Sequence, residues 1–420
     1  MSRLLLLLPR TTYRAESFLE AAGRLKLHVT VGCEDQDHHY HGAGHDQLTL
    51  NFRDTADCVH TAVRYAAEHP IQAILGVDDN TAILAATLSA ALGLPHNTVD
   101  SVSAARNKYR MRQLLREHGV PVPAFGVCSI HDDPLAVAKT LRYPCVVKPL
   151  VLSASCGVIR ADTPAEFTAA FHRVSALLRK LGLAASADDS GRLLLVEDFI
   201  PGGEVALEGL LTDGKLRVLA LFDKPDPLDG PFFEETIYIT PSRLSPAIQA
   251  DIALCAARAA LALGLREGPV HGEMRVNATG VWMIELAARS IGGRCSRTLR
   301  FAAGLSLEDV ILRHALRMAL PELDGAQRPA GVMMLPILKS GVLQEVRGRT
   351  DALAVPGVEE LVITAQAGED LVPLPEGTRY LGFLIARGND AEAVEATLRE
   401  AYGRLEVVMS RTPSAQALSF

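Results

Sequence analysis

The sequence predicts an α/β protein with α+β parts. Between Arg3 and about Asn97, short apolar runs alternate with amphipathic helical patterns, which is typical of βαβ units around a parallel sheet. Later in the chain, pairs of strand-like segments flank short turns, and such pairs favour antiparallel hairpins. The chain has 420 residues, which is too long for one ordinary core and indicates two or three domains.

The N-terminal region begins with the apolar strand LLLLL and continues with the helical pattern YRAESFLEAAGRL and the strand LHVTV. A further strand, IQAILGV, precedes the helical pattern NTAILAATLSAALGL. The turn after the first strand reads PRTTYRA and lacks the GxGxxG of a dinucleotide site, so this Rossmann-like region does not support NAD binding. Asp78 and Asp79 end a strand where a helix begins. Ligands often bind at that position, although a helix cap explains the pair more simply.

Composition argues against several classes of partner. The residues are 48% hydrophobic and 22% charged with a net charge of −7, and no block of Lys and Arg provides the basic surface that nucleic-acid binding needs. Seven scattered cysteines without a CxxC pair predict reduced thiols and a cytoplasmic location. The apolar run at residues 4–8 is too short for a signal sequence, and no run approaches the roughly 20 residues of a membrane span. We therefore expect neither nucleic acid nor a membrane as a partner.

Two glutamates lie in the stretch VHGEMRVNATGVWMIELA, whose halves read as strands around the turn NATG. If the loop has three residues with Gly280 in the left-handed position, Asn277 pairs with Val281 and Glu273 lies directly opposite Glu285. Two facing carboxylates repel unless a cation lies between them, and Mg²⁺ prefers such oxygen ligands. An exposed hairpin with solvated glutamates explains this fragment equally well.

Other segments carry groups suited to a nucleotide. Lys108 lies near the start of a helical pattern, Lys148 lies in the apolar strand YPCVVKP, and the small-residue stretch LVLSASCGVI follows it. An ammonium in an apolar strand needs an anionic partner, unless it snorkels to the surface. The acidic residues Glu197, Asp198 and Glu204 surround the turn PGG. Lysines and backbone amides bind phosphate oxygens, and the facing glutamates hold the Mg²⁺ that bridges them. Together these features predict a nucleoside triphosphate site without the P-loop motif.

Taken in order along residues 99–320, these features resemble those of the ATP-grasp superfamily. The stretches DKPDPLDGPFFEETIYITPSRL, ELAARSIGG and GVMMLPILKSGVLQEVRG are more closely similar to L-amino acid ligases. The resemblance implies a Rossmann-like N-terminal domain at 1–98 and an ATP-grasp domain at 99–320 with a lid subdomain at about 121–200. It also implies a C-terminal α+β ligase subdomain at 321–420.

The resemblance further implies a role for each matched position. ATP phosphates contact Lys108 and Lys148 while the loop with Ser153, Ser155 and Gly157 closes over them. Glu197 lies at the adenine edge, the main chain of Asp198 and Ile200 forms the hinge, and Glu204 binds the ribose. Glu273 and Glu285 ligate Mg²⁺, with Mn²⁺ as the alternative ion, and Arg289 stabilises the transferred phosphoryl group. The substrate side of the site comprises Glu235, His271, Gly292 and Gly293, although a packed histidine explains His271 equally well. Many superfamily members have an asparagine ligand where this chain has Ala287.

The implied activity is ATP- and Mg²⁺-dependent carboxylate-amine ligation. An amino acid or related carboxylate becomes an acyl phosphate, and an amine or second amino acid displaces the phosphate. The partners are then small molecules, and a homodimer is a family expectation. Two alternatives remain: a biotin carboxylase-like or purine-pathway ligase that activates bicarbonate or formate, and a non-catalytic ATP-binding module.

Overall fold

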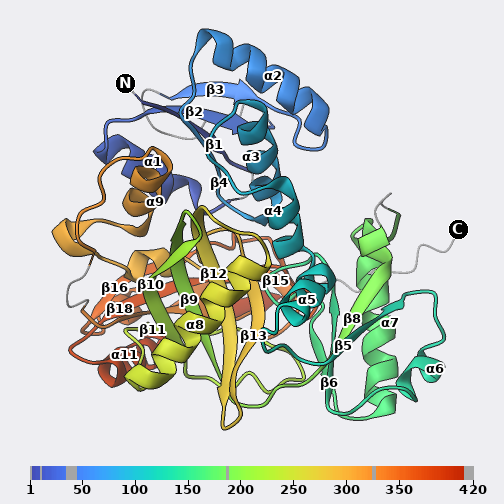
Figure 1. Cartoon of the computed structure of the whole chain (residues 1–420). Helices are drawn as coiled ribbons and strands as arrows, with labels where there is room; N and C mark the ends of the chain where they lie inside the picture. The colour runs from blue at the N-terminus through green and yellow to red at the C-terminus, as the bar shows by residue number, and fades with distance from the viewer. Residues whose placement is uncertain (1, 10–11, 35–44, 186–188, 324–327, 411–420) are drawn as a thin grey trace, which may run out of the picture.

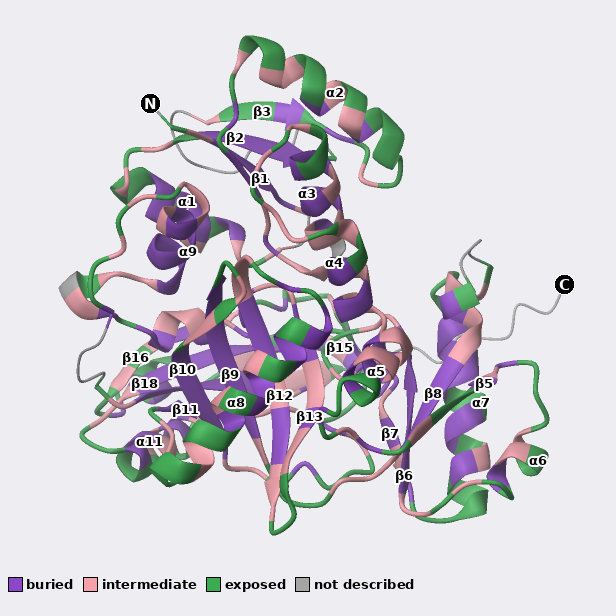
Figure 2. Ribbon diagram, in the orientation of Figure 1, coloured by how far each residue is buried: buried purple, intermediate pink, exposed green. Residues whose placement is uncertain are grey.

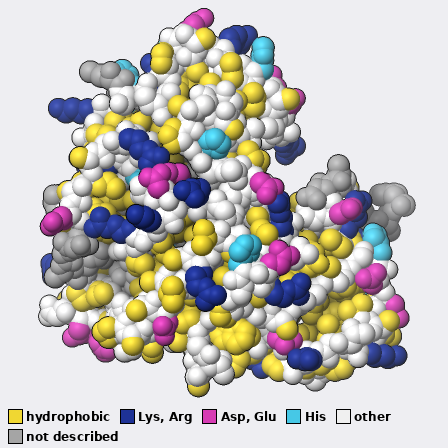
Figure 3. All heavy atoms as spheres, in the orientation of Figure 1, with side chains coloured by type: hydrophobic (Ala, Val, Ile, Leu, Met, Phe, Trp, Pro, Cys, Tyr) yellow, Lys and Arg dark blue, Asp and Glu magenta, His cyan; other side chains and the backbone are white. Residues whose placement is uncertain are grey.

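The computed structural model of the chain describes residues 2–9, 12–34, 45–185, 189–323 and 328–410 (Figure 1). It is an α/β structure with α+β parts, as predicted: among the described residues one sheet is parallel, and the other three are antiparallel. No helix among the described residues is long and apolar enough to span a membrane. On the face drawn in Figure 3, basic and acidic side chains are interspersed.

The N-terminal sheet is parallel with strand order β3-β2-β1-β4. The first strand is buried because its leucines face helices on both sides of the sheet. The predicted alternation of strands and helices is confirmed here (Figure 1). The strands are β1 (Arg3–Leu7), β2 (His28–Cys33), β3 (Asp46–Thr49) and β4 (Ala73–Gly76), and the helices are α1 (Ala15–Arg24), α2 (Thr55–Glu68) and α3 (Asp79–Ala91).

The central sheet has eight strands in the order β13-β12-β9-β10-β11-β14-β18-β16. Its middle strands are buried (Figure 2), with α8 (Pro246–Ala262) packed at one end and α11 (Ala391–Gly403) at the other. Three of its strands come from the C-terminal part of the chain, which therefore continues the central sheet. The strands are β9 (Gly203–Thr212), β10 (Lys215–Lys224), β11 (Ile237–Thr240), β12 (Gly268–Asn277), β13 (Gly280–Ala287), β14 (Ala330–Leu335), β16 (Val358–Ile363) and β18 (Gly382–Arg387).

A third sheet, with order β5-β8-β6-β7, lies to one side of the central sheet (Figure 1). Helix α7 (Pro164–Lys180) covers it through an apolar stripe that includes Phe167, Phe171 and Leu178. Strands β8 and β9 flank the PGG turn but belong to different sheets, so this turn joins two layers. The strands are β5 (Phe125–Ser129), β6 (Cys145–Pro149), β7 (Ile159–Ala161) and β8 (Leu193–Asp198), accompanied by α6 (Pro134–Ala138).

A break between two helices sets the position of Lys108. The chain around Lys108 forms two helices, α4 (Val99–Arg106) and α5 (Lys108–Glu117). Asn107 separates them because its side chain accepts hydrogen bonds from the backbone N–H groups of Tyr109 and Arg110 and so caps α5. Lys108 is therefore the first residue of α5.

The remaining elements are β15 (Gly341–Arg347), β17 (Asp370–Leu371), β19 (Glu406–Ser410), α9 (Leu307–Ala315), α10 (Arg349–Leu353) and short 3-10 turns at Leu183–Ala185, Asp189–Arg192, Cys295–Thr298 and Ala302–Gly304.

Candidate active site

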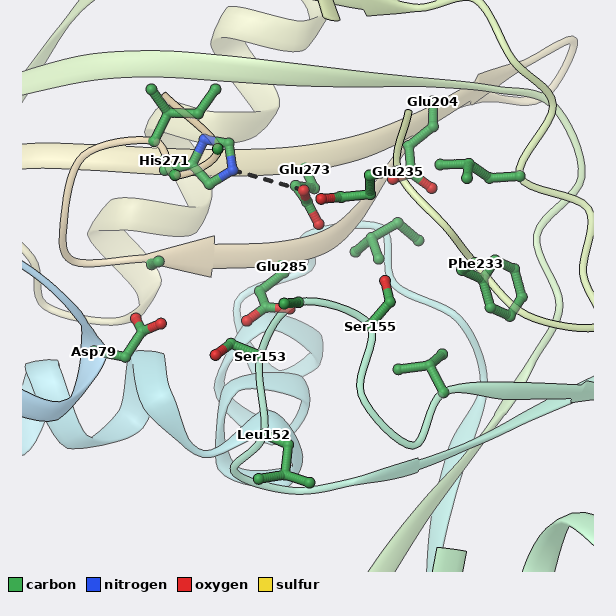
Figure 4. Close-up of a pocket in the computed structure, with 18 of the residues that line it drawn as sticks. Asp79, Leu152, Ser153, Ser155, Glu204, Phe233, Glu235, His271, Glu273 and Glu285 are labelled. Carbon is green, nitrogen blue, oxygen red and sulfur yellow. Dashed lines mark ion pairs between the residues drawn. The ribbon is translucent and has the colours of Figure 1, made fainter. Parts of the chain in front are cut away.

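A cavity of about 350 Å³ lies where the N-terminal loops, the third sheet, the central sheet and the C-terminal segment meet. Every site residue predicted from the sequence lines this cavity except Gly157. The wall also contains Asp79, for which a ligand position or a helix cap was predicted, and residues that were not predicted, among them Arg14, Tyr238, Arg275 and Tyr380. Residues far apart in the sequence thus share one pocket, part of which is drawn in Figure 4.

Glu273 and Glu285 are direct partners in the β12–β13 hairpin, as predicted. The route to this register differs from the prediction, because the loop is shorter and Asn277 pairs with Gly280. A β-bulge then adds one residue, Ile284, to β13 and restores the alignment of the two glutamates. The shorter loop and the bulge therefore offset each other, and Glu273 remains opposite Glu285.

Each facing glutamate has its own lysine. The Nζ of Lys108 lies 3.3 Å from Glu285 Oε1, and the Nζ of Lys224 lies 2.9 Å from Glu273 Oε1. Figure 4 shows both carboxylates on neighbouring strands at the edge of the cavity. The cations offset the repulsion between the glutamates, and two hard oxygen donors remain that suit Mg²⁺. The donor set therefore fits the predicted ion.

Lys224 occupies a buried carboxylate cluster that the sequence reading did not identify. Its Nζ lies 2.8 Å from Glu204, 2.8 Å from Glu235 and 2.9 Å from Glu273. The oxygens of these three glutamates lie within 4.8 Å of one another, which is metal-like spacing, but the ammonium already lies among them. We therefore treat the cluster as a lysine site. Lys224 ends the apolar strand LALFDK, so the argument applied to Lys148 also applies to it.

The cluster shifts several pKa values. Burial raises the pKa of Glu235 to about 7, although Lys224 opposes the shift. Burial acts on Glu273 as well, but Lys224 and His271 outweigh it and hold the pKa of Glu273 well below its usual value. Burial alone would lower the pKa of Lys224, and the three carboxylates instead raise it well above normal. Lys224 therefore stays charged, and Glu235 takes up a proton more readily than Glu273.

Lys148 is buried at 6% exposure, which excludes the snorkelling explanation. Its Nζ pairs with Glu197, and Arg112 pairs with the other oxygen of the same carboxylate. Burial raises the pKa of Glu197, but Arg112 and Lys148 outweigh it and leave this pKa below normal. Arg112 also donates to the carbonyl of Ile284 at 2.6 Å, so it joins the bulge to the predicted adenine edge.

The loop after Lys148 has a constrained backbone. Ala154 and Ser155 both have φ of +54°, and Gly157 has φ of +73°. Left-handed backbone costs free energy in residues with a side chain, so outside contacts must hold this conformation. Lys108 supplies one, because its Nζ donates to the Leu152 carbonyl at 2.7 Å. Figure 4 shows Ser153 and Ser155 on this loop, and Gly157 lies outside the cavity wall.

Arg289 is anchored by the N-terminal region. Its Nε donates to Asp79 Oδ1 at 2.8 Å and its Nη1 donates to the Ser290 carbonyl at 3.0 Å. Burial raises the pKa of Asp79, but Arg289 outweighs it and leaves this pKa below normal. The neighbouring Asp78 accepts from Thr81 N–H at 3.2 Å. The two aspartates thus have separate roles: Asp78 caps α3, and Asp79 orients the arginine.

The last residues predicted for the site, Gly292, Gly293 and His271, also line the cavity. Gly293 N–H donates to the Tyr13 hydroxyl at 2.8 Å, and a Cβ at Gly292 would lie 3.0 Å from that oxygen. These glycines allow the N-terminal loop to approach closely. His271 is buried, with its Nε2 3.6 Å from Glu273 and its Nδ1 3.9 Å from Glu208. Burial lowers the pKa of His271. It both lines the cavity and packs in the sheet, so the two predicted alternatives are compatible.

Three family models match the chain. They are the ATP-grasp domain at residues 141–298, the ATP-grasp N-terminal domain at 19–96 and the L-amino acid ligase C-terminal domain 2 at 333–410. The chain belongs to the ATP-grasp superfamily. The C-terminal match agrees with the predicted resemblance to L-amino acid ligases.

Individual ATP-grasp proteins are similar at low identity. The L-amino acid ligase structure from Bacillus licheniformis superposes with a TM-score of 0.81 at 25% identity, covering 98% of this chain and 99% of that one. D-alanine–D-alanine ligase B of Chromobacterium violaceum is 27% identical over 231 residues, which is 53% of this chain and 71% of that protein. Alanine–anticapsin ligase of Bacillus subtilis is 26% identical over 234 residues, which is 53% of this chain and 49% of that protein.

Another solved structure matches more weakly. The N5-carboxyaminoimidazole ribonucleotide synthetase from Thermotoga maritima superposes with a TM-score of 0.71 over 98% of this chain and 100% of that one. Its sequence identity is 15%, so this likeness shows the fold alone.

Proposed function

We propose that this ATP-grasp protein is an ATP- and Mg²⁺-dependent carboxylate-amine ligase. It activates an amino acid or related carboxylate as an acyl phosphate, joins it to an amine or second amino acid, and releases ADP and phosphate. The main support is the convergence of Glu273, Glu285, Lys108, Lys148 and Arg289 on one cavity. A site that only binds ATP has no chemical need for the arginine beside the facing carboxylates.

The nucleotide half of the proposal assigns roles to the cavity wall. Lys108 and Lys148 bind phosphates beneath the loop of Ser153 and Ser155, and the main chain of Asp198 and Ile200 binds adenine. Glu197 orients Lys148 through their buried ion pair. Glu204, whose Oε1 pairs with Lys224 and whose Oε2 pairs with Arg275, lines the cavity and accepts from the ribose hydroxyls.

Glu273 and Glu285 are the proposed Mg²⁺ ligands. When bound, the ion would supply neutralising charge to the ATP phosphates. Ala287 offers no third ligand and lies opposite His271 in the strand pair. A further donor would have to be another side chain or water.

The remaining residues position the acid and the amine. The substrate carboxylate attacks the γ-phosphate, and Arg289 stabilises the charge on the transferred phosphoryl group. The amine then attacks the acyl carbon, and phosphate leaves. Gly292 and Gly293 allow the chain to close around the acyl group, and Glu235 and His271 border the space for the amine. Exclusion of water protects the acyl phosphate from hydrolysis.

The ligase C-terminal match favours an amino acid as the activated acid over bicarbonate or formate. The proposal retains the predicted regions 1–98, 99–320 and 321–420, a cytoplasmic location and small-molecule partners, with a homodimer as a family expectation.

The deciding experiment measures phosphate release with ATP and Mg²⁺ across a matrix of amino acids and amines, with products identified by mass spectrometry. A ligated product formed together with phosphate supports the proposal. Turnover only with bicarbonate, or ATP binding without turnover on any pair, would favour the respective alternative.

A further inference from the structure

The segment 373–380 contacts both helix α7 and the loop at residues 152–157, which we call the phosphate loop. The N–H of Gly157 donates to the Pro375 carbonyl at 2.8 Å. Arg173 on α7 pairs with Glu376 through two parallel hydrogen bonds, the second of which joins Nη2 to Oε2 at 2.8 Å. Arg173 also lowers the pKa of Glu376. A bidentate arginine-carboxylate pair fixes orientation as well as distance.

The other end of the same segment belongs to the cavity. Thr378 and Tyr380 line it, and the Tyr380 hydroxyl lies 3.3 Å from Glu235 Oε2. Glu235 in turn contacts Lys224 at 2.8 Å. Only a few residues therefore separate a contact to the phosphate loop from a contact on the proposed substrate side.

Residues 231 and 232 make further contacts to this part of the chain. The Arg160 N–H donates to the Pro231 carbonyl at 2.9 Å, and the guanidinium of Arg173 lies 4.9 Å from the ring centre of Phe232. The left-handed residues at 154, 155 and 157 lie between these contacts and Lys108. The phosphate loop is thus held at both ends, which its costly backbone conformation requires.

We propose that Arg173 and Glu376 are positioning residues that latch the phosphate loop closed, and that the segment 373–380 couples this closure to occupation of the substrate side of the cavity. This inference rests on the proposed function, which assigns one side of the cavity to the nucleotide and the other to the substrates. Neither residue touches the reacting atoms. The latch acts through the amide of Gly157, which the Pro375 carbonyl holds.

The test compares four variants. Glu376→Gln and Arg173→Gln each break the ion pair, and Arg173→Glu combined with Glu376→Arg restores it with reversed charge. Glu359→Gln is the matched control, because Glu359 also forms a partly exposed pair, with Arg387 at 2.9 Å, on β16 and β18 away from the cavity. All these side chains are partly exposed, so thermal unfolding should show folded proteins.

Two readouts do not depend on ligase activity: hydrogen exchange of the peptide covering residues 150–160, and affinity for a non-hydrolysable ATP analogue with Mg²⁺. We expect each single variant to speed exchange and weaken affinity by about twofold to fivefold, the range for a partly exposed pair. The charge-swapped double variant should recover most of the loss, and the control should match the parent protein. Parent-like exchange and affinity in both single variants, or no recovery in the double variant, would overturn the latch.

A third readout tests the coupling. With a productive acid and amine, the single variants should release more phosphate per ligated product, because an open loop admits water to the acyl phosphate. An unchanged ratio would overturn the coupling. A parent protein that binds the analogue but ligates no pair would instead refute the proposed function, while the exchange data still decide the latch.

Discussion

Glu273 lies directly opposite Glu285 because Ile284 forms a bulge in β13. Arg112 donates to the bulged carbonyl at 2.6 Å and pairs with Glu197, which in turn holds Lys148. The geometry of the proposed metal ligands is therefore linked to that of a proposed phosphate ligand through one buried arginine. A change at Arg112 should disturb both.

Glu285→Gln should abolish turnover while leaving the fold intact. The substitution removes one charge from the proposed Mg²⁺ site and keeps the side-chain shape, so we expect a loss on the order of 10²-fold or more, as for other groups that stabilise transition-state charge. Steady-state phosphate release and Mn²⁺ binding would be measured together. Glu400→Gln, at an exposed helical pair with Arg404, is the control. Near-normal rates and metal affinity in Glu285→Gln would remove the metal assignment.

Lys224→Met should destabilise the protein strongly. Three carboxylates lose their shared cation, and breaking a buried ion pair in this way costs about 3–5 kcal/mol. Urea unfolding at pH 8 measures the loss. At pH 5 the loss should shrink, because the unpaired carboxylates take up protons more readily than in the unfolded chain. Lys215→Met, at the exposed start of the same strand, should change stability little. An equal loss for Lys224→Met at both pH values would argue against the carboxylate cluster as its cause.

Sequence reasoning identified residues whose need for a partner is visible locally. Lys148 in an apolar strand and two glutamates in one hairpin are unusual on desolvation and repulsion alone. It did not identify Arg112 or Arg14, because their partners lie on distant segments and nothing in their own neighbourhoods is unusual. The bulge at Ile284 was not predicted either. The shorter loop and the extra bulged residue offset each other, so the two glutamates have the same sequence spacing as in a regular three-residue hairpin.

The arrangement of the sheets was also predicted only in part. The parallel N-terminal sheet follows from local alternation, and it was predicted. The C-terminal strands join the central sheet because β14 pairs with β11. The local sequence pattern does not specify that pairing.

Glu208→Gln should stabilise the protein at high pH. Glu208 is fully buried, its Oε1 has no hydrogen-bond partner among the described residues, and burial raises its pKa well above normal. A carboxyl whose pKa is higher in the folded state stabilises the fold below its unfolded pKa and loses that contribution as pH rises toward the folded value. The parent protein should therefore lose about 1.4 kcal/mol for each pH unit in this window. Glutamine does not titrate and can still accept from Ile291 N–H, as Glu208 does at 2.9 Å. Urea unfolding from pH 5 to 9 should show a gain for Glu208→Gln that grows with pH, and a constant difference would refute this assignment.

Arg289→Lys should slow ligation far more than it weakens ATP binding. The guanidinium lines the cavity while Nε binds Asp79 and Nη1 binds the Ser290 carbonyl, and an ammonium cannot reproduce this fork. We expect kcat to fall by about 10²-fold to 10³-fold, with the affinity for an ATP analogue within a few-fold of the parent. Asp79→Asn separates anchoring from charge, because it keeps an acceptor for Nε but removes the ion pair, so its loss should be smaller than that of Arg289→Lys. Kinetics with the best acid and amine pair, together with calorimetric ATP-analogue binding, would measure both. If Arg289→Lys lost analogue affinity and kcat in proportion, the arginine would be a ground-state nucleotide ligand rather than the group that stabilises the transferred phosphoryl.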